Sequence, residues 1–144
     1  MFSLIITIVS IALVVALVAA TMYHGGDTLT QGRTTADAAA FVTGAQQVGG
    51  AAVMFQSLES TEALAVTELV TKKYLASAPV VKGTALAIPA AAADANIVSS
   101  TVASDAVCEQ INKTAGAADP KVVADIGNLA YGCISATKLF QFKY

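Results

Sequence analysis

The feature that most constrains this chain is its N-terminal segment, residues 1–26, which contains no Asp, Glu, Lys or Arg. From residue 1 to residue 22 the segment is apolar on every face of a helix, and its few hydroxyl groups can bond back to carbonyls of that helix. At about 1.5 Å per residue, such a helix spans roughly 33 Å, enough to cross the hydrocarbon core of a bilayer. We call residues 1–26 the tail. We expect it to be a helix that needs lipid, or copies of itself, as a partner.

A cleaved secretory signal peptide is the alternative interpretation of the tail, because Val18-Ala19-Ala20 could serve as a cleavage site. The absence of a basic residue before the apolar run, and the length of that run, favour a retained helix instead. Met1 is then the candidate processed N-terminus. The side chains expected to drive assembly are Phe2, Leu4, Ile5, Ile8, Ile11, Leu13, Val14, Leu17 and Val18.

After the tail the chain is predicted to continue as an amphipathic helix over residues 27–58. Gly25 and Gly26 weaken a helix by about 1 kcal/mol each relative to Ala, so they are a candidate flexible point between the two parts. The apolar residues of the second part recur at steps of four and three, which predicts one buried stripe. This stripe, expected to pack on a globular head, consists of Phe41, Ala45, Val48, Ala52 and Phe55.

Residues 59–144 are predicted to form that head, with short helices and strands. The expected elements are a helix over 62–76 that Pro79 stops, short extended pieces over 80–88, a strand over 97–102, a helix from the N-cap Ser104 to about Gly116, and two strands within 131–144. In the last strand Phe140, Phe142 and Tyr144 alternate with polar residues, which indicates one buried and one wet face.

The chain has two cysteines, Cys108 and Cys133, so one intramolecular disulfide is the expected pairing if the head lies outside the cytosol. Such a bridge would close a region over 108–133 and stabilise the head by about 3–4 kcal/mol. Two separate buried thiols are the alternative, since free Cys packs as a small hydrophobe.

The composition argues against catalysis and against binding of nucleic acid. Charged residues make up 12% of the chain, about half the usual share, and its eight Lys and Arg are scattered among ten Asp and Glu. A single His leaves no Ser–His–Asp triad, and no loop has the density of oxygen donors that calcium prefers. We expect no catalytic, metal or cofactor site. Asn112-Lys113-Thr114 matches the N-glycosylation rule, so Asn112 is a candidate glycosylation site.

Taken together, these parts resemble the type IV pilins. The charge-free tail leads into a long helix, Leu64 to Pro79 looks like the segment that follows this helix in many pilins, and Val107 to Gly116 is similar to a cysteine–asparagine–glycine segment of the type IVb branch. The chain differs from most bacterial pilins at Ile5, where they carry a glutamate; archaeal pilins and some unusual bacterial filaments also lack that acid.

The resemblance implies an α+β fold in which a long hydrophobic helix packs, through its C-terminal half, on a small antiparallel sheet with a C-terminal disulfide. It implies the major subunit of an extracellular type IV pilus (fimbrium), a homopolymeric helical filament, and it leaves open whether the fibre serves cell adhesion, motility, DNA uptake or conjugation. Before assembly, a subunit of this kind is methylated at its N-terminus, anchored in the inner membrane and handled by pilus assembly machinery. Two alternatives stay open: a membrane-anchored pseudopilin of a secretion system, and a small binding protein with a single transmembrane helix and a secreted head.

Overall fold

A computed structural model describes residues 2–63, 65–89 and 96–144 of the chain. The chain divides into two compact units, one that ends at Arg33 and a second that runs from Thr34 to Tyr144. The predicted boundary after Gly26 and the predicted role of Gly25 and Gly26 as a flexible point stay predictions. Met1, the candidate processed N-terminus, lies outside the described residues.

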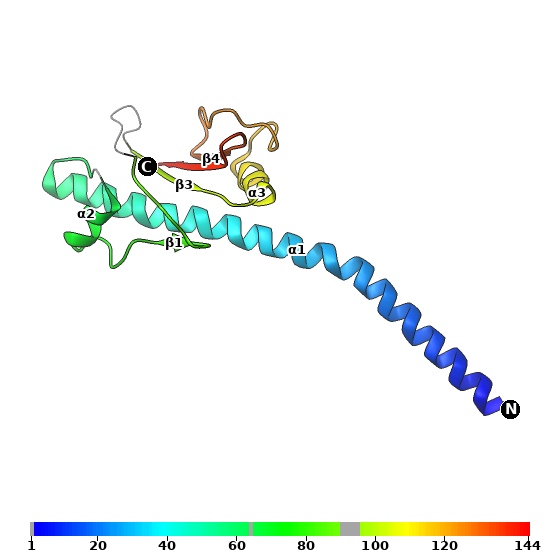
Figure 1. Cartoon of the computed structure of the whole chain (residues 1–144). Coiled ribbons are helices and arrows are strands. Elements are labelled where there is room, and N and C mark those ends of the chain that lie inside the picture. Colours follow the sequence, from blue (N-terminus) through cyan, green and yellow to red (C-terminus); the bar gives the residue numbers. More distant parts are fainter. Residues whose placement is uncertain (1, 64, 90–95) are drawn as a thin grey trace. The chain divides into compact units, whose positions relative to one another are not determined.

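One long helix, α1 (Phe2–Glu59), contributes to both units (Figure 1). Its backbone is helical through both Gly25 and Gly26. In the first unit, hydroxyl groups of α1 bond to carbonyls three or four residues earlier, as between Ser10 and Ile6 at 2.8 Å and between Thr21 and Val18 at 2.9 Å. These bonds satisfy the hydroxyl donors, whose burial in an apolar environment would otherwise cost free energy.

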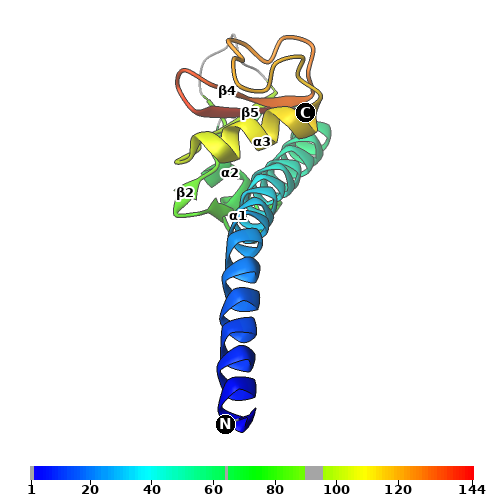
Figure 2. The same cartoon turned by 90° about the vertical axis from the view of Figure 1, so that its right-hand side faces the viewer.

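The second unit is α+β, as predicted, and consists of the C-terminal part of α1, two further helices and two small antiparallel sheets. The elements after α1 are α2 (Val66–Thr71), β1 (Val80–Val81), β2 (Thr84–Ala85), β3 (Ile97–Thr101), α3 (Asp105–Ala115), β4 (Tyr131–Ile134) and β5 (Leu139–Lys143). Strands β1 and β2 form a hairpin, and β5 lies between β3 and β4 in the other sheet. Both views show the three-stranded sheet beside α1, with α3 next to β4 (Figures 1 and 2).

The core of the second unit lies around the predicted stripe of α1. Phe41, Ala45, Val48, Ala52 and Phe55 are each at most 2% exposed. The ring of Phe41 lies 5.9 Å from that of Phe140 in β5. On a neighbouring face of α1, a Cβ added at Gly44 would lie 3.2 Å from a methyl of Leu86 beside β2. The helix therefore packs between the sheet and the hairpin, and its periodicity decides which face is covered.

The close approach of β5 to α1 occurs at Gly49. A Cβ there would lie 2.9 Å from Cβ of Tyr144 and 3.3 Å from Cε1 of Phe142, whereas a Cβ at Gly50 meets nothing within 4 Å. Gly49→Ala and Gly50→Ala gain the same helix propensity, but only the first crowds the end of β5. We expect Gly50→Ala to raise the free energy of unfolding. The free energy of unfolding of Gly49→Ala should be about 1–3 kcal/mol lower than that of Gly50→Ala, as measured by urea denaturation. Equal stability of the two variants would contradict this contact.

The helix predicted over 62–76 is shorter in the structure, where α2 covers only Val66–Thr71. It ends because Lys73 adopts a left-handed backbone conformation, with a φ of 64°, and because the N–H groups of Tyr74 and Leu75 turn back to the carbonyl of Leu69. Pro79 lies well beyond this end, so it is not the stop signal. The predicted end of α3 is confirmed, since Gly116 is left-handed with a φ of 81°. Ser104 occupies the N-cap position, but its side chain makes no capping hydrogen bond.

Candidate assembly surface and disulfide-linked region

Most of the exposed large apolar side chains of the described residues lie in the tail. Phe2, at 85%, is the most exposed of the predicted assembly residues, and Val18, at 48%, is the least. The other predicted assembly residues lie between these two values, and they are Leu4, Ile5, Ile8, Ile11, Leu13, Val14 and Leu17. Of the described residues, one helix, α1, is long and apolar enough to cross a membrane. Exposed apolar surfaces of this kind are typical of sites that contact lipid or protein.

The predicted disulfide between Cys108 and Cys133 is confirmed. It joins α3 to β4, with the two Cα atoms 5.3 Å apart and 25 residues between them in sequence. Both cysteines are at most 3% exposed. The described residues therefore contain no free thiol, and the alternative of two separate buried thiols is wrong.

Asn112 forms a second connection between the same two elements, which the sequence did not indicate. Its Nδ2 donates to the carbonyl of Cys133 at 2.8 Å and to that of Pro120 at 3.0 Å. Its Oδ1 accepts from the N–H of Cys133 at 2.7 Å. The amide thus pairs with β4 as a neighbouring strand would, and it satisfies both main-chain groups of a buried residue.

The burial of Asn112 argues against its being a glycosylation site, which the sequence offered only as a candidate. The residue is 0% exposed, and Nδ2, the atom to which a glycan is attached, makes two hydrogen bonds inside the fold. A sugar on that nitrogen would have to displace these bonds and the surrounding packing. Asn112 is therefore a structural residue in this fold, although its tripeptide satisfies the sequence rule.

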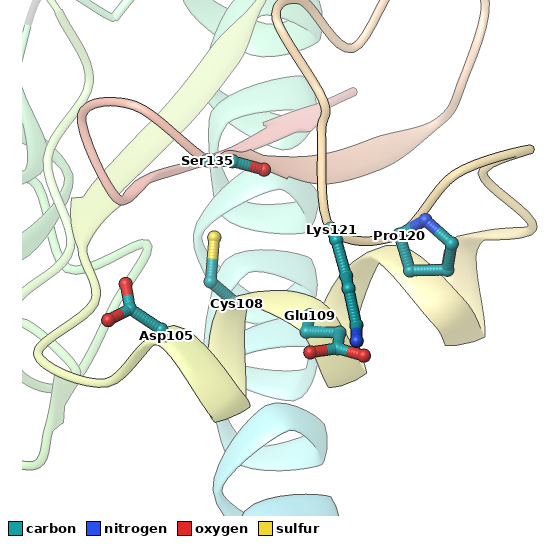
Figure 3. A pocket seen from close by; sticks show the side chains of 6 residues that line it. All are labelled: Asp105, Cys108, Glu109, Pro120, Lys121 and Ser135. Carbon is teal, nitrogen blue, oxygen red and sulfur yellow. The ribbon is translucent and has the colours of Figure 1, made fainter.

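At least three surface clefts lie among the described residues of the second unit. The first, of about 220 Å³, is here called the Cys108 cleft (Figure 3). Its lining residues come from α3, from the loop that follows α3 and from the residue after β4, and they are Asp105, Cys108, Glu109, Pro120, Lys121 and Ser135. Charges of both signs line it, and the carboxylate of Asp105 lies 3.0 Å from Nζ of Lys138. Among the described residues no group of three or more His, Cys, Asp or Glu could hold a metal.

The other two clefts lie against α1. The Lys82 cleft, of about 130 Å³, contains an ion pair between Lys82 and Asp37, with Nζ and Oδ1 3.1 Å apart. The Tyr131 cleft, of about 240 Å³, has no charged residue in its lining, which consists of Thr35, Ala38, Ala39, Val42, Thr43, Thr114 and Tyr131. The three clefts therefore differ in the chemistry that they offer to a partner.

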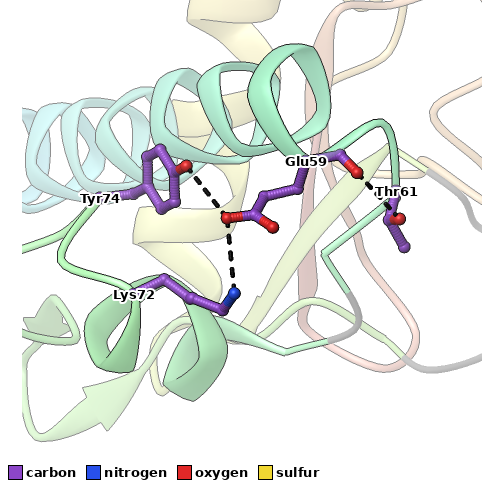
Figure 4. A network of polar contacts seen from close by, with 4 residues as sticks. All are labelled: Glu59, Thr61, Lys72 and Tyr74. Atoms are coloured by element: carbon purple, nitrogen blue, oxygen red, sulfur yellow. Dashed lines mark hydrogen bonds and ion pairs between the residues drawn. The ribbon is translucent and has the colours of Figure 1, made fainter.

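A polar network ties the end of α1 to the segment after α2 (Figure 4). Oε1 of Glu59 lies 3.4 Å from Nζ of Lys72 and 3.5 Å from the hydroxyl of Tyr74. The ring of Tyr74 also meets that of Phe55 edge-on, at 5.4 Å between centroids. Because Glu59 and Lys72 are exposed, their ion pair contributes at most about 1 kcal/mol, and the aromatic contact is the firmer anchor.

The last residue, Tyr144, has a phenol whose pKa is raised above 10.0, first by burial and second by the negative charge of Glu62. A raised pKa means that the folded state prefers the neutral phenol. The resulting stability is complete below the unfolded pKa and is lost as the pH rises through the folded one. We expect the free energy of unfolding to fall as the pH rises above about 10, and to fall less steeply in Tyr144→Phe. Denaturation curves at several alkaline pH values test this, and equal slopes for both proteins would contradict it.

Comparisons of the chain with protein-family models, with curated protein sequences and with solved structures found no match. Function is therefore inferred from the residues and from their arrangement. The sequence pattern located the exposed tail, the buried stripe and the disulfide. The sequence pattern did not predict the hydrogen bonds of Asn112 or the clefts. The nearest signal was the predicted pairing of Cys108 with Cys133, because a disulfide between them implies that α3 lies beside β4.

Proposed function

We propose that this chain is the structural subunit of an extracellular, type IV pilus-like filament, and that it acts by polymerising rather than by catalysis. The observation that carries the proposal is the tail, a helix whose apolar side chains are exposed on every face. Such a helix cannot stay dispersed in water, because each apolar side chain gains about 25 cal/mol per Å² when it leaves water. Packing among identical tails would remove the apolar side chains on every face of the helix from water.

The second unit supports the proposal because it is a folded body with its own core. The apolar stripe of α1 is buried inside that body, so the exposed apolar surface is concentrated in the tail. A chain with one such surface can use it first to lie in a membrane and later to pack against neighbours. A staggered contact of this kind does not close on itself, and it therefore yields a helical filament with the second units outside.

The disulfide supports an extracellular destination. Disulfides persist in oxidising compartments and are rare in the cytosol. The bond between Cys108 and Cys133 therefore favours a second unit that lies outside the cytosol. Partners in this proposal are other copies of the chain, the membrane before assembly and an assembly machinery. No cofactor is required.

The second candidate is a membrane-anchored protein, either a small binding protein or a pseudopilin of a secretion system. The observation that favours it is the length of α1, which is sufficient for a membrane anchor even if the chain never polymerises.

Negative-stain microscopy and sedimentation separate the candidates. The full chain is purified in detergent, and the detergent is then removed. We expect regular fibres that contain the chain. Monomers that remain dispersed without detergent would overturn the proposal, and disordered aggregates or particles confined to lipid vesicles would favour the anchor.

A further inference from the structure

The Tyr131 cleft differs from the other clefts because its lining is neutral. The Cys108 cleft carries the charges of Asp105, Glu109 and Lys121, and the Lys82 cleft those of Lys82 and Asp37. An occupant of either would have to displace water from charged groups, which opposes the binding of an apolar group. The Tyr131 cleft presents no such obstacle.

The walls of the Tyr131 cleft are held by the core of the second unit. Ala38 is only 2% exposed, and the ring of Tyr131 stacks on that of Phe142, with centroids 6.4 Å apart. On the rim, the hydroxyl of Thr114 already donates to the carbonyl of Ile111 at 2.8 Å. The cleft is therefore a preformed, largely apolar surface, and its volume of about 240 Å³ is large enough for one aliphatic or aromatic side chain.

Most of the exposed aliphatic and aromatic side chains of the described residues belong to the tail. All of its predicted assembly residues are exposed, and no charged residue lies among them. The cleft begins at Thr35, the second residue of the second unit, so it lies at the N-terminal end of that unit's share of α1.

We propose that the Tyr131 cleft receives an apolar side chain from the tail of a second copy of this chain. This inference rests on the proposed function and adds to it a specific contact between unlike surfaces. A contact between tail and cleft is heterologous, so each copy offers one of each and the series continues without closing. Such a contact would also fix the axial stagger between copies, which tails that are apolar on every face cannot do by themselves.

The first test fills the cleft. Ala39 lines the cleft and is exposed, so Ala39→Trp places a large side chain in it without entering the core. Ala106→Trp is the matched control, since Ala106 is an exposed residue of α3 outside the lining of the three clefts. We expect Ala39→Trp to lower the yield of sedimented fibres about tenfold or more, and Ala106→Trp to leave it close to that of the unchanged chain. Equal yields in the two variants would overturn the inference while the proposed function stands.

The second test identifies the occupant and does not depend on the yield of Ala39→Trp. A photoreactive benzoylphenylalanine replaces Thr43, an exposed residue at the rim, in fibres made from isotopically light and heavy copies. We expect mixed light–heavy cross-links to the tryptic peptide that ends at Arg33. Cross-links only to the second unit, only within one copy, or to none at all would overturn the inference. If the unchanged chain forms no fibres, the proposed function itself fails, which is a distinct result.

Discussion

Leu13→Asp is expected to abolish polymerisation while leaving the second unit folded. Leu13 lies in the middle of the tail and is 60% exposed, so its side chain supports no core within the chain. An aspartate at the centre of a membrane helix costs about 2.5–3.5 kcal/mol. Among packed tails every copy would bury such a carboxylate without a partner, and the penalty would recur at each step of the polymer. Fibre yield by sedimentation and microscopy measures the effect.

Leu13→Met is the control for this change, since it keeps the volume and the apolar character of the side chain and should polymerise normally. The state of the second unit is followed separately, by urea denaturation and by the mass of the intact disulfide. Because Leu13 belongs to the first unit, both variants should unfold the second unit at the same denaturant concentration. Abundant fibres from Leu13→Asp, or unfolding of its second unit, would refute the division of roles between tail and second unit.

The second large effect is expected from Asn112→Ala, which should lower the free energy of unfolding of the second unit by about 3–5 kcal/mol. The truncation leaves the N–H and the C=O of Cys133 without the partners that now lie 2.7 and 2.8 Å away. Cys133 is 0% exposed, so water cannot replace the lost hydrogen bonds. Chemical denaturation under non-reducing conditions gives the value, because the disulfide then holds α3 to β4 in both proteins.

Thr114→Ala separates this structural effect from a loss of glycosylation. It removes the glycosylation tripeptide as completely as Asn112→Ala does, but it leaves the Asn112 amide in place. Thr114 is exposed, and its hydroxyl bonds only to carbonyls of its own helix, so its loss should change stability by less than about 1 kcal/mol. A large and equal loss in both variants, when each is made in cells that glycosylate, would point to a glycan instead.

Elements with a strong period were predictable from the sequence. The buried stripe from Phe41 to Phe55 was predictable because residues on one face of a helix recur about every 3.6 positions. An apolar pattern with this period therefore identifies the buried face without knowledge of what packs against it. Gly116 ends α3 because glycine adopts the left-handed conformation without a steric penalty. The short α2 was not predictable, since its end depends on Lys73, a non-glycine residue in the left-handed conformation, and the next residue, Tyr74, packs against Phe55 of another helix.

The sequence by itself determined that this chain has a charge-free helix needing an apolar partner, a second segment with one buried stripe, and cysteines able to pair. Each of these follows from local composition and spacing, which act before any distant contact forms. Only the tertiary structure decided that Asn112 is a buried bridge to Cys133 rather than a surface acceptor, and that the lining of the Tyr131 cleft is neutral. Both depend on which main-chain groups and side chains, distant in the sequence, the fold brings together. The identity of a single residue does not indicate which neighbours it will have in the fold.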